Sequence, residues 1–230
     1  MKKGKFIVID GTDGSGKATQ VALLTKRLKK EGFRVKVVDF PDYYSNFFGK
    51  FIGHCLTEQY YNFLKVHSKI ASVLYAADRF ESKDKIEKWL RGGYVVLANR
   101  YVSANQIHQG GKIKNASKRK AFIKWLDVME YKVFKIPRPD VVLYLDLPMK
   151  IILKLIKERN KSSNRNYVGK KKDIVEGDLD YLSNSRESAN WLVKTEKYYR
   201  KIDCALKDSI RTREDIHEEI YKKVKNLLKK

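Results

Sequence analysis

A glycine-rich loop directly after an apolar run constrains the fold of this chain most strongly. Residues 5–10 (KFIVID) predict a buried strand, and residues 11–19 (GTDGSGKAT) follow it and lead into a helical pattern. The loop matches G-x-x-x-x-G-K, whose glycines let successive backbone N–H groups point inward while the next helix directs its positive end to the same place. The order strand, loop, helix therefore predicts a phosphate-binding loop.

The loop also predicts where ATP, the phosphoryl donor, would bind, but it lacks the residue that usually holds the metal ion. Lys17 supplies a point charge for the β- and γ-phosphates of ATP. Ala18 stands where the motif uses Ser or Thr to hold Mg²⁺, so we expect ATP oxygens, water and carboxylates to hold the ion, with Asp13 as a candidate ligand. The predicted ATP-binding residues are Gly11, Thr12, Asp13, Gly14, Ser15, Gly16, Lys17, Ala18 and Thr19.

Further apolar runs alternate with helical patterns along the whole chain. Nearly continuous apolar runs are typical of strands covered on both faces, and strand–helix alternation favours a parallel sheet. We therefore predict one domain over residues 1–230, with an α/β, three-layer P-loop NTPase fold, a five-stranded parallel sheet and helices on both faces. The expected strands are 5–10, 35–40, 94–99, 141–147 and, more weakly, 201–205; the expected helices are 17–30, 69–78, 83–90, 118–134, 149–159, 180–200 and 213–228.

Composition excludes some classes of protein. The formal net charge is +23, from 50 Lys and Arg against 27 Asp and Glu, which favours polyanionic ligands. The lysines are spread along the chain, so we expect a solvated surface and no specific nucleic-acid site. The sequence contains no run of 18 apolar residues, so we expect no membrane span. The two isolated cysteines, Cys55 and Cys204, favour buried thiols in a reducing cytoplasm.

Several motifs, in order, resemble the thymidylate kinase family. The resemblance covers nearly the whole chain and rests on the phosphate loop with its interior Asp13, Phe40-Pro41, Ala77-Asp78-Arg79-Phe80, Asn99-Arg100-Tyr101, residues 105–111 (NQIHQGG) and Arg138-Pro139-Asp140. The phosphate loop is specific to a superfamily, whereas the ordered set is specific to this family. The resemblance implies phosphorylation of dTMP to dTDP with ATP and Mg²⁺, in a cytoplasmic homodimer.

The resemblance also implies an acceptor site. Arg79 would bind O4 of thymine, and the Asn105 amide would satisfy both a donor and an acceptor on the N3/O4 edge. Arg100 would contact the dTMP phosphate and the transferring group, since its fork suits phosphate oxygens. The implied dTMP-binding residues are Phe40 and Tyr75 beside the base, Arg79, Arg100 and Asn105, with His108 and Gln109 near the base and sugar.

Some positions depart from the family pattern. Asn99 replaces an aspartate, and Tyr43 stands where many members have an arginine for the acceptor phosphate. Residues 157–178 resemble a basic lid, and its Arg159 or Arg165 would supply the positive charge that the phosphate loop lacks at Gly14. With these two arginines, the implied catalytic set comprises Lys17, Arg100, Asp13, Arg159 and Arg165.

The departures leave alternatives open. The chain could be a related kinase for another deoxynucleotide, nucleotide or nucleoside. It could also be a basic P-loop ATPase that binds DNA, with salt-sensitive binding. An inactive member that only binds nucleotide is a further alternative, because the Asn99 amide carries no charge to help hold Mg²⁺.

Overall fold

A five-stranded parallel sheet forms the centre of the molecule. The computed structural model describes residues 3–12, 14–57, 63–162, 179–207 and 209–229, with the backbone alone at residues 64 and 156–162. The sheet has the strand order β2-β3-β1-β4-β5, and each neighbouring pair is parallel. Its strands are β1 (Lys5–Gly11), β2 (Val35–Asp39), β3 (Val95–Asn99), β4 (Val141–Asp146) and β5 (Tyr199–Asp203).

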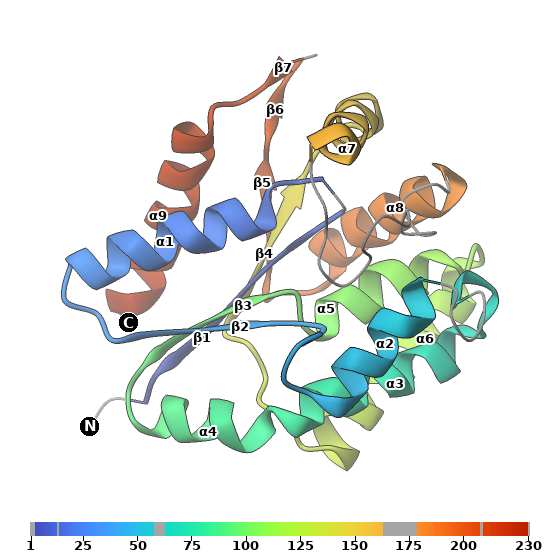
Figure 1. Cartoon of the computed structure of the whole chain (residues 1–230), viewed down its shortest axis with the longest axis horizontal. Helices are drawn as coiled ribbons and strands as arrows, with labels where there is room; N and C mark the ends of the chain where they lie inside the picture. Colours follow the sequence, from blue (N-terminus) through green and yellow to red (C-terminus); the bar gives the residue numbers. More distant parts are fainter. Residues whose placement is uncertain (1–2, 13, 58–62, 163–178, 208, 230) are drawn as a thin grey trace.

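Helices lie on both faces of this sheet, which gives three layers (Figure 1). Helices α1 and α9 lie together on one face, and α4, α6 and α8 lie across the other (Figure 1). The helices are α1 (Lys17–Lys30), α2 (Phe47–Leu56), α3 (Ser68–Glu81), α4 (Lys83–Arg91), α5 (Val102–Ala104), α6 (Ala116–Asp127), α7 (Met149–Ser162), α8 (Leu179–Thr195) and α9 (Arg213–Lys229). Shorter turns are the 3₁₀ helix η1 (Phe63–Lys65) and the π-helices η2 (Asn105–Gln109) and η3 (Val128–Val133).

Alternation along the strands builds a separate hydrophobic core on each face. In β1, Val8 packs into the core under α4, α6 and α8, whereas Ile7 and Ile9 pack against α1 and α9. Because both faces of the sheet are buried, each strand is a nearly continuous run of apolar residues in the sequence. A smaller cluster of Ile52, Cys55 and other residues joins α2 to α3 beside the main core.

The predicted fold class is confirmed, and the boundaries differ in a few places. The pattern over residues 180–200 predicts one helix, but α8 ends at Thr195 and β5 begins at Tyr199. Tyr199 and Ile202 are buried in the sheet, so packing overrides the local helical pattern there. Helix α2 was not predicted; Gly49 and Gly53 lower its intrinsic propensity, and packing against α3 stabilises it.

The strands direct their carboxyl ends to one edge of the sheet. Asp39 of β2 pairs in register with Asn99 of β3, and Ile9 of β1 pairs with the same residue. Asp10 is the last residue but one of β1, and Asp146 ends the neighbouring strand β4. In a parallel α/β sheet this edge is where ligands bind, so polar residues that end these strands are the first candidates for a site.

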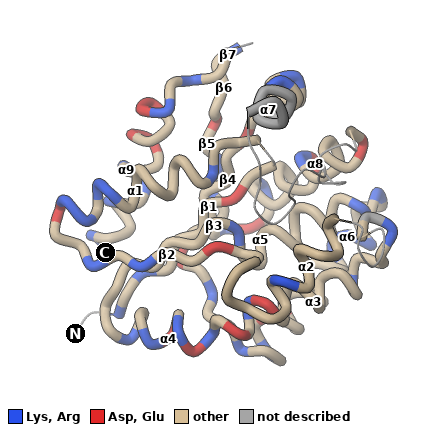
Figure 2. The backbone as a smooth tube through the Cα atoms, in the orientation of Figure 1, with Lys and Arg blue, Asp and Glu red and all other residues tan. Residues whose placement is uncertain are grey.

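Charged side chains are distributed over the whole molecule. Figure 2 shows Lys and Arg recurring along α1, α4, α6 and α9 instead of gathering on a single element. Within the described residues, no helix combines the length and the apolar character that a membrane span requires.

Candidate active site

The phosphate loop connects β1 to α1 as the sequence predicts. Gly16 has φ 84°, a left-handed conformation that suits glycine, and α1 begins at the next residue. A Cβ on Gly11 would lie 2.8 Å from the backbone oxygen of Leu145, so only glycine lets β1 and β4 approach this closely here. Lys17 Nζ donates to the backbone oxygens of Gly11 (3.0 Å) and Thr12 (2.9 Å). The loop is therefore held closed around its own lysine.

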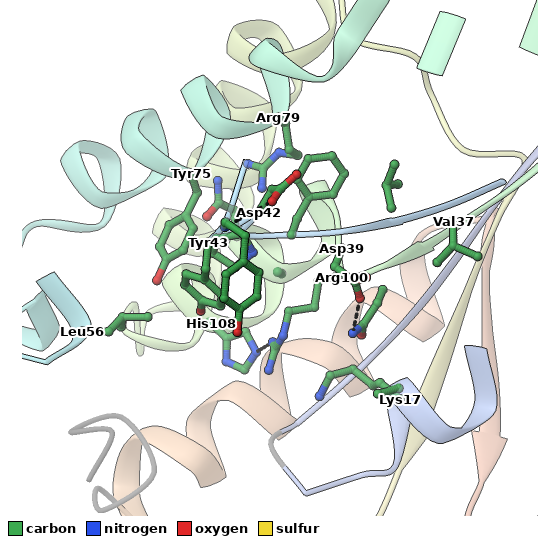
Figure 3. Close-up of a pocket in the computed structure, with 18 of the residues that line it drawn as sticks. Lys17, Val37, Asp39, Asp42, Tyr43, Leu56, Tyr75, Arg79, Arg100 and His108 are labelled. Carbon is green, nitrogen blue, oxygen red and sulfur yellow. Dashed lines mark hydrogen bonds between the residues drawn. The ribbon is translucent and has the colours of Figure 1, made fainter. Parts of the chain in front are cut away.

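A cavity of about 790 Å³ extends from this loop to the far side of the carboxyl edge. Arg79 and Tyr75 lie at one end and Lys17 at the other, with Arg100 between them (Figure 3). The predicted residues that line it are Gly14, Gly16, Lys17, Ala18, Thr19, Phe40, Tyr75, Arg79, Arg100, Asn105, His108 and Gln109. A single cavity thus joins the predicted donor site to the predicted acceptor site.

Arg100 occupies the centre of the cavity in an unusual backbone conformation. Its φ is 66°, which is uncommon for a residue with a side chain and is found most often where function constrains the backbone. Its Nη1 lies 2.8 Å from Nε2 of His108 and 3.9 Å from Oδ1 of Asp10. A guanidinium can only donate, so Nε2 of His108 is the acceptor. The ring N–H is then at Nδ1.

Asp10 is a site residue that sequence reasoning missed. It is fully buried at the end of β1, accepts from the backbone N–H of Gly11 (2.8 Å), and accepts from the Ser103 hydroxyl. Its carboxylate faces Arg100 across the edge of the sheet. An acid inside an otherwise apolar strand, directly before the phosphate loop, was the signal available in the sequence.

Arg79 lies at the other end of the cavity within a buried ion pair. Its exposed fraction is 1%, and Glu130 accepts from its Nε (3.1 Å) and its Nη2. Nη1 donates to the backbone oxygen of Tyr101 at 3.3 Å. Burial alone would lower the pKa of Arg79, but the Glu130 carboxylate raises that pKa, so the guanidinium stays charged.

Asn105 differs from the expectation in one respect. Its Nδ2 donates to the backbone oxygen of Ser72 and to Oε1 of Glu130, both at 3.2 Å. Both amide donors are therefore used within the protein, and Oδ1 is the group left for a ligand. The expected donation from this amide to a base finds no free hydrogen in this structure, because Glu130 and the backbone oxygen of Ser72 accept both.

Aromatic rings form the walls of this end of the cavity. Tyr75 lies beside Phe63 (ring centroids 5.7 Å apart), and Phe40 packs on Tyr101 (5.6 Å). Tyr43 and Tyr75 both reach into the cavity near His108 (Figure 3). Such rings provide apolar faces on which a planar base can stack.

Comparisons with known proteins agree with this geometry. The family model described as thymidylate kinase matches residues 9–220. This chain belongs to the thymidylate kinase family. The thymidylate kinase of Caldicellulosiruptor saccharolyticus is 31% identical over 99% of both chains, and that of Plasmodium falciparum is 29% identical over 97% of this chain and 90% of its own length.

A solved structure supports the fold. The thymidylate kinase of Candida albicans superposes with a TM-score of 0.73, covering 97% of this chain and 92% of its own, at 21% identity. At that identity the match establishes the P-loop kinase fold alone. Together with the family model, it identifies the chain as a nucleoside monophosphate kinase, a transferase.

Tyr181 also lines the cavity, and the sequence did not predict it as a site residue. Its ring stacks on His108, with centroids 6.0 Å apart and planes inclined by 11°. It comes from α8, which packs against η2, so a sequence pattern alone could not place it there. His108 therefore lies between Arg100 and an aromatic ring, while the neighbouring Gln109 is buried and lines the same wall.

The carboxyl edge also carries oxygen donors that fit a hard cation. Asn99 Nδ2 donates to Asp39 Oδ1 at 2.8 Å, and Asn99 Oδ1 is buried with no hydrogen-bond partner among the described residues. Asp39, at the end of β2, thus brings a carboxylate beside the amide that replaces the family's aspartate. Carboxylate and amide oxygens suit Mg²⁺, so these residues fit the ion that the sequence resemblance implies. Within the described residues, no group of three or more His, Cys, Asp or Glu forms a metal centre by itself.

Some predicted site residues lie outside the described part of the chain. These are Asp13 in the loop, Arg165, the side chain of Arg159 and most of the predicted lid at residues 157–178. The backbone of residues 157–162 continues α7, which ends at Ser162, and Leu155 of this helix lines the cavity.

Proposed function

We propose that this protein transfers the γ-phosphoryl group of ATP to the 5′-phosphate of dTMP, giving dTDP and ADP. The observation that carries the proposal is the single cavity that joins the phosphate loop to the Arg79 end through Arg100. Phosphoryl transfer needs the two phosphates in line and their oxygens neutralised, and this arrangement serves both needs.

The donor end binds ATP. Loop N–H groups and the start of α1 hold the β- and γ-phosphates, and Lys17 exchanges its two backbone oxygens for phosphate oxygens. Mg²⁺ supplies charge neutralisation for the phosphates when bound. Asp10, Asp39 and Asn99 are the described residues that would hold it directly or through water, and Asp13 remains a candidate by sequence.

The centre of the cavity carries the transfer. Arg100 binds oxygens of the acceptor phosphate and of the group in flight, where a fixed cation stabilises developing charge. His108 and Asp10 hold the guanidinium in place before substrate arrives. Arg159 and Arg165 of the lid segment are candidates for a second positive charge.

The far end binds the base. Arg79 donates to O4, Asn105 accepts from N3–H, and Phe40 and Tyr75 pack beside the ring. His108 and Gln109 lie where the sugar would pass. The acceptor phosphate then falls near Arg100, and Tyr43 contributes a hydroxyl where other members have an arginine.

We also propose a homodimer in the cytoplasm. Exposed apolar side chains gather on helices that lie side by side in Figure 1, namely α2, α3 and α6 with its continuation η3. They are Phe47, Ile70, Val73, Phe80, Val128 and Val133. Patches of this kind mark interfaces, and a second copy of the chain is the partner that the family resemblance implies. The buried, unbridged cysteines Cys55 and Cys204 suit a reducing compartment.

A direct transfer assay tests the proposed reaction. Purified protein is mixed with ATP, Mg²⁺ and dTMP, and dTDP is separated from the reactants by ion-exchange chromatography. Formation of dTDP equimolar with ADP is expected. ADP without dTDP would indicate a hydrolase, and a rise in that hydrolysis on adding DNA would support the DNA-binding ATPase instead.

A further inference from the structure

Glu130 is a buried carboxylate behind the base end of the cavity. It comes from η3, is fully buried, and does not line the cavity itself. Its two oxygens accept from Nε and Nη2 of Arg79 and from Nδ2 of Asn105. One side chain thus contacts both residues that are proposed to read the base, although these come from α3 and η2.

The carboxylate fixes the orientation of the Asn105 amide. An ionised carboxylate can only accept, so the amide must direct Nδ2 toward Glu130 and Oδ1 away from it. The backbone oxygen of Ser72 accepts the second Nδ2 hydrogen at 3.2 Å. Asn105 therefore presents an acceptor to a ligand and has no donor left.

The same carboxylate fixes the Arg79 guanidinium. Arginine has five N–H donors in a rigid fork. Glu130 takes one from Nε and one from Nη2, and the backbone oxygen of Tyr101 takes one from Nη1. The remaining donors, one on each terminal nitrogen, lie at the end of the guanidinium and suit a carbonyl oxygen.

We infer that Glu130 is a positioning residue that makes the site selective for a 4-oxo pyrimidine over a 4-amino pyrimidine. This inference rests on the proposed function. Thymine offers a donor at N3 and an acceptor at O4, which match Asn105 Oδ1 and the Arg79 donors. Cytosine offers an acceptor at N3 and a donor at N4. Asn105 Oδ1 would then face another acceptor, and the Arg79 N–H groups would face another donor. A site that leaves buried polar groups unpaired rejects such a base strongly.

The identity of the side chain at position 130 matters for this role. A glutamine there offers one acceptor and one donor in place of two acceptors, so it cannot accept from Nε and Nη2 of Arg79 and from Nδ2 of Asn105 as the carboxylate does. The loss of the negative charge would also leave Arg79 as an unpaired buried cation. Selectivity therefore depends on a residue that never touches the substrate.

The test compares Glu130→Gln with the wild-type protein on dTMP and dCMP. The ratio of kcat/KM for dTMP to that for dCMP is expected to fall at least about 10-fold, chiefly through a higher KM for dTMP. The KM for ATP is expected to stay within about 2-fold, because the phosphate loop is untouched. The matched control is Glu187→Gln, which removes the carboxylate of another Arg–Glu pair, Arg119–Glu187, and should leave the ratio unchanged.

Different outcomes would contradict the role of Glu130 and the proposed function. If the wild-type protein does not phosphorylate dTMP, the proposed function fails. If it does, and folded Glu130→Gln keeps the wild-type ratio, the role of Glu130 is overturned while the proposed function stands. Should Glu130→Gln fail to fold, Glu130→Asp keeps the charge beside Arg79 but draws the carboxylate back by one methylene group, and the ratio is expected to fall in this variant as well. A folded Glu130→Asp variant with the wild-type ratio would also overturn the inference.

Discussion

Single side chains at the carboxyl edge of the sheet carry the proposed chemistry, and Arg100 is the one on which transfer depends most. Its left-handed backbone directs the side chain between the two substrate ends, where His108 and Asp10 hold it. A preorganised charge of this kind contributes most when charge develops in the transition state.

Arg100→Ala is expected to lower kcat by at least about 10²-fold, because a fixed cation is lost from the transferring group. Arg100→Lys should recover only part of that rate, since an ammonium cannot contact two oxygens in a fork. Steady-state kinetics with saturating ATP and dTMP measure the effect. An unchanged kcat in Arg100→Ala would remove this residue from the transfer step.

Lys17→Ala is expected to lower kcat/KM for ATP by at least about 10²-fold, because Nζ no longer neutralises the β- and γ-phosphates. Lys26→Ala, an exposed lysine on the same helix, serves as the control for charge alone and should keep wild-type kinetics. Wild-type turnover in Lys17→Ala would contradict the phosphate-loop assignment.

The sequence predicts which residues line the cavity better than it predicts their hydrogen-bond partners. Lys17, Arg79, Arg100 and Asn105 were all placed at the cavity from local motifs, and all line it. The motifs could not show that Glu130 uses the donors of Asn105, because Glu130 is 25 residues away and belongs to another element. Nor could they show that Asp39 lies beside Asn99, since that pair forms only when β2 and β3 align.

At the scale of elements, α3 holds the segment that follows β2 against the cavity. Asp78 accepts from the backbone N–H of Asp42 (3.2 Å) and from Asn46 Nδ2 (2.9 Å), and Glu81 accepts from Phe47 and Phe48 N–H (both 2.8 Å). These contacts position Tyr43 in the cavity wall and cap the start of α2. Hydrogen bonds on both sides of Tyr43 therefore hold this turn to α3.

The same contacts predict a dependence of stability on pH. Burial raises the pKa of Asp78 to about 6, from about 4 in the unfolded chain, although Asn46 and Arg79 oppose the rise. Between these values the unfolded state releases a proton that the folded state keeps. This group therefore reduces the free energy of unfolding as pH rises from about 4 to about 6, by on the order of 1–3 kcal/mol.

Asp78→Asn is expected to remove this contribution to the pH dependence of stability. Urea unfolding at several pH values from 4 to 7 should show the wild-type protein losing stability relative to the variant as pH rises, since all other titrating groups cancel in the difference. A difference that stays constant over this range would show that Asp78 has the same pKa in the folded and the unfolded protein.

Elements were predicted well where local pattern and packing agree. Helix α1 has the predicted bounds, because its apolar period faces the sheet and its loop fixes its start. Helix α8 ends earlier than predicted, since the sheet recruits Tyr199 and Ile202 into β5. Helix α2 has two glycines and depends on packing against α3 for its stability, so its local sequence did not predict it.

At the scale of the whole molecule, the apolar faces of α2, α3 and η3 predict a dimer. Ile70 and Val133 are 61% and 66% exposed, and they belong to the group of exposed apolar side chains on these elements. The double variant Ile70→Glu/Val133→Glu is expected to elute as a monomer in size-exclusion chromatography with light scattering, because two buried charges oppose association. Leu206→Glu alters an equally exposed residue on β6 (Ala205–Leu206) and should leave the dimer intact. A dimeric Ile70→Glu/Val133→Glu variant, or a monomeric wild-type protein, would contradict this interface.

One cavity is proposed to hold both substrates while a phosphoryl group passes from ATP to thymidylate. The most direct test is kcat/KM for each of dTMP, dUMP, dCMP, dAMP, dGMP and the ribonucleoside monophosphates, with ATP and Mg²⁺ held saturating. The geometry predicts dTMP as the best acceptor, dUMP weaker and dCMP far weaker, because Asn105 and Arg79 present an acceptor and donors in fixed order. A preference for a purine or cytidine monophosphate, or no transfer to any acceptor, would contradict it.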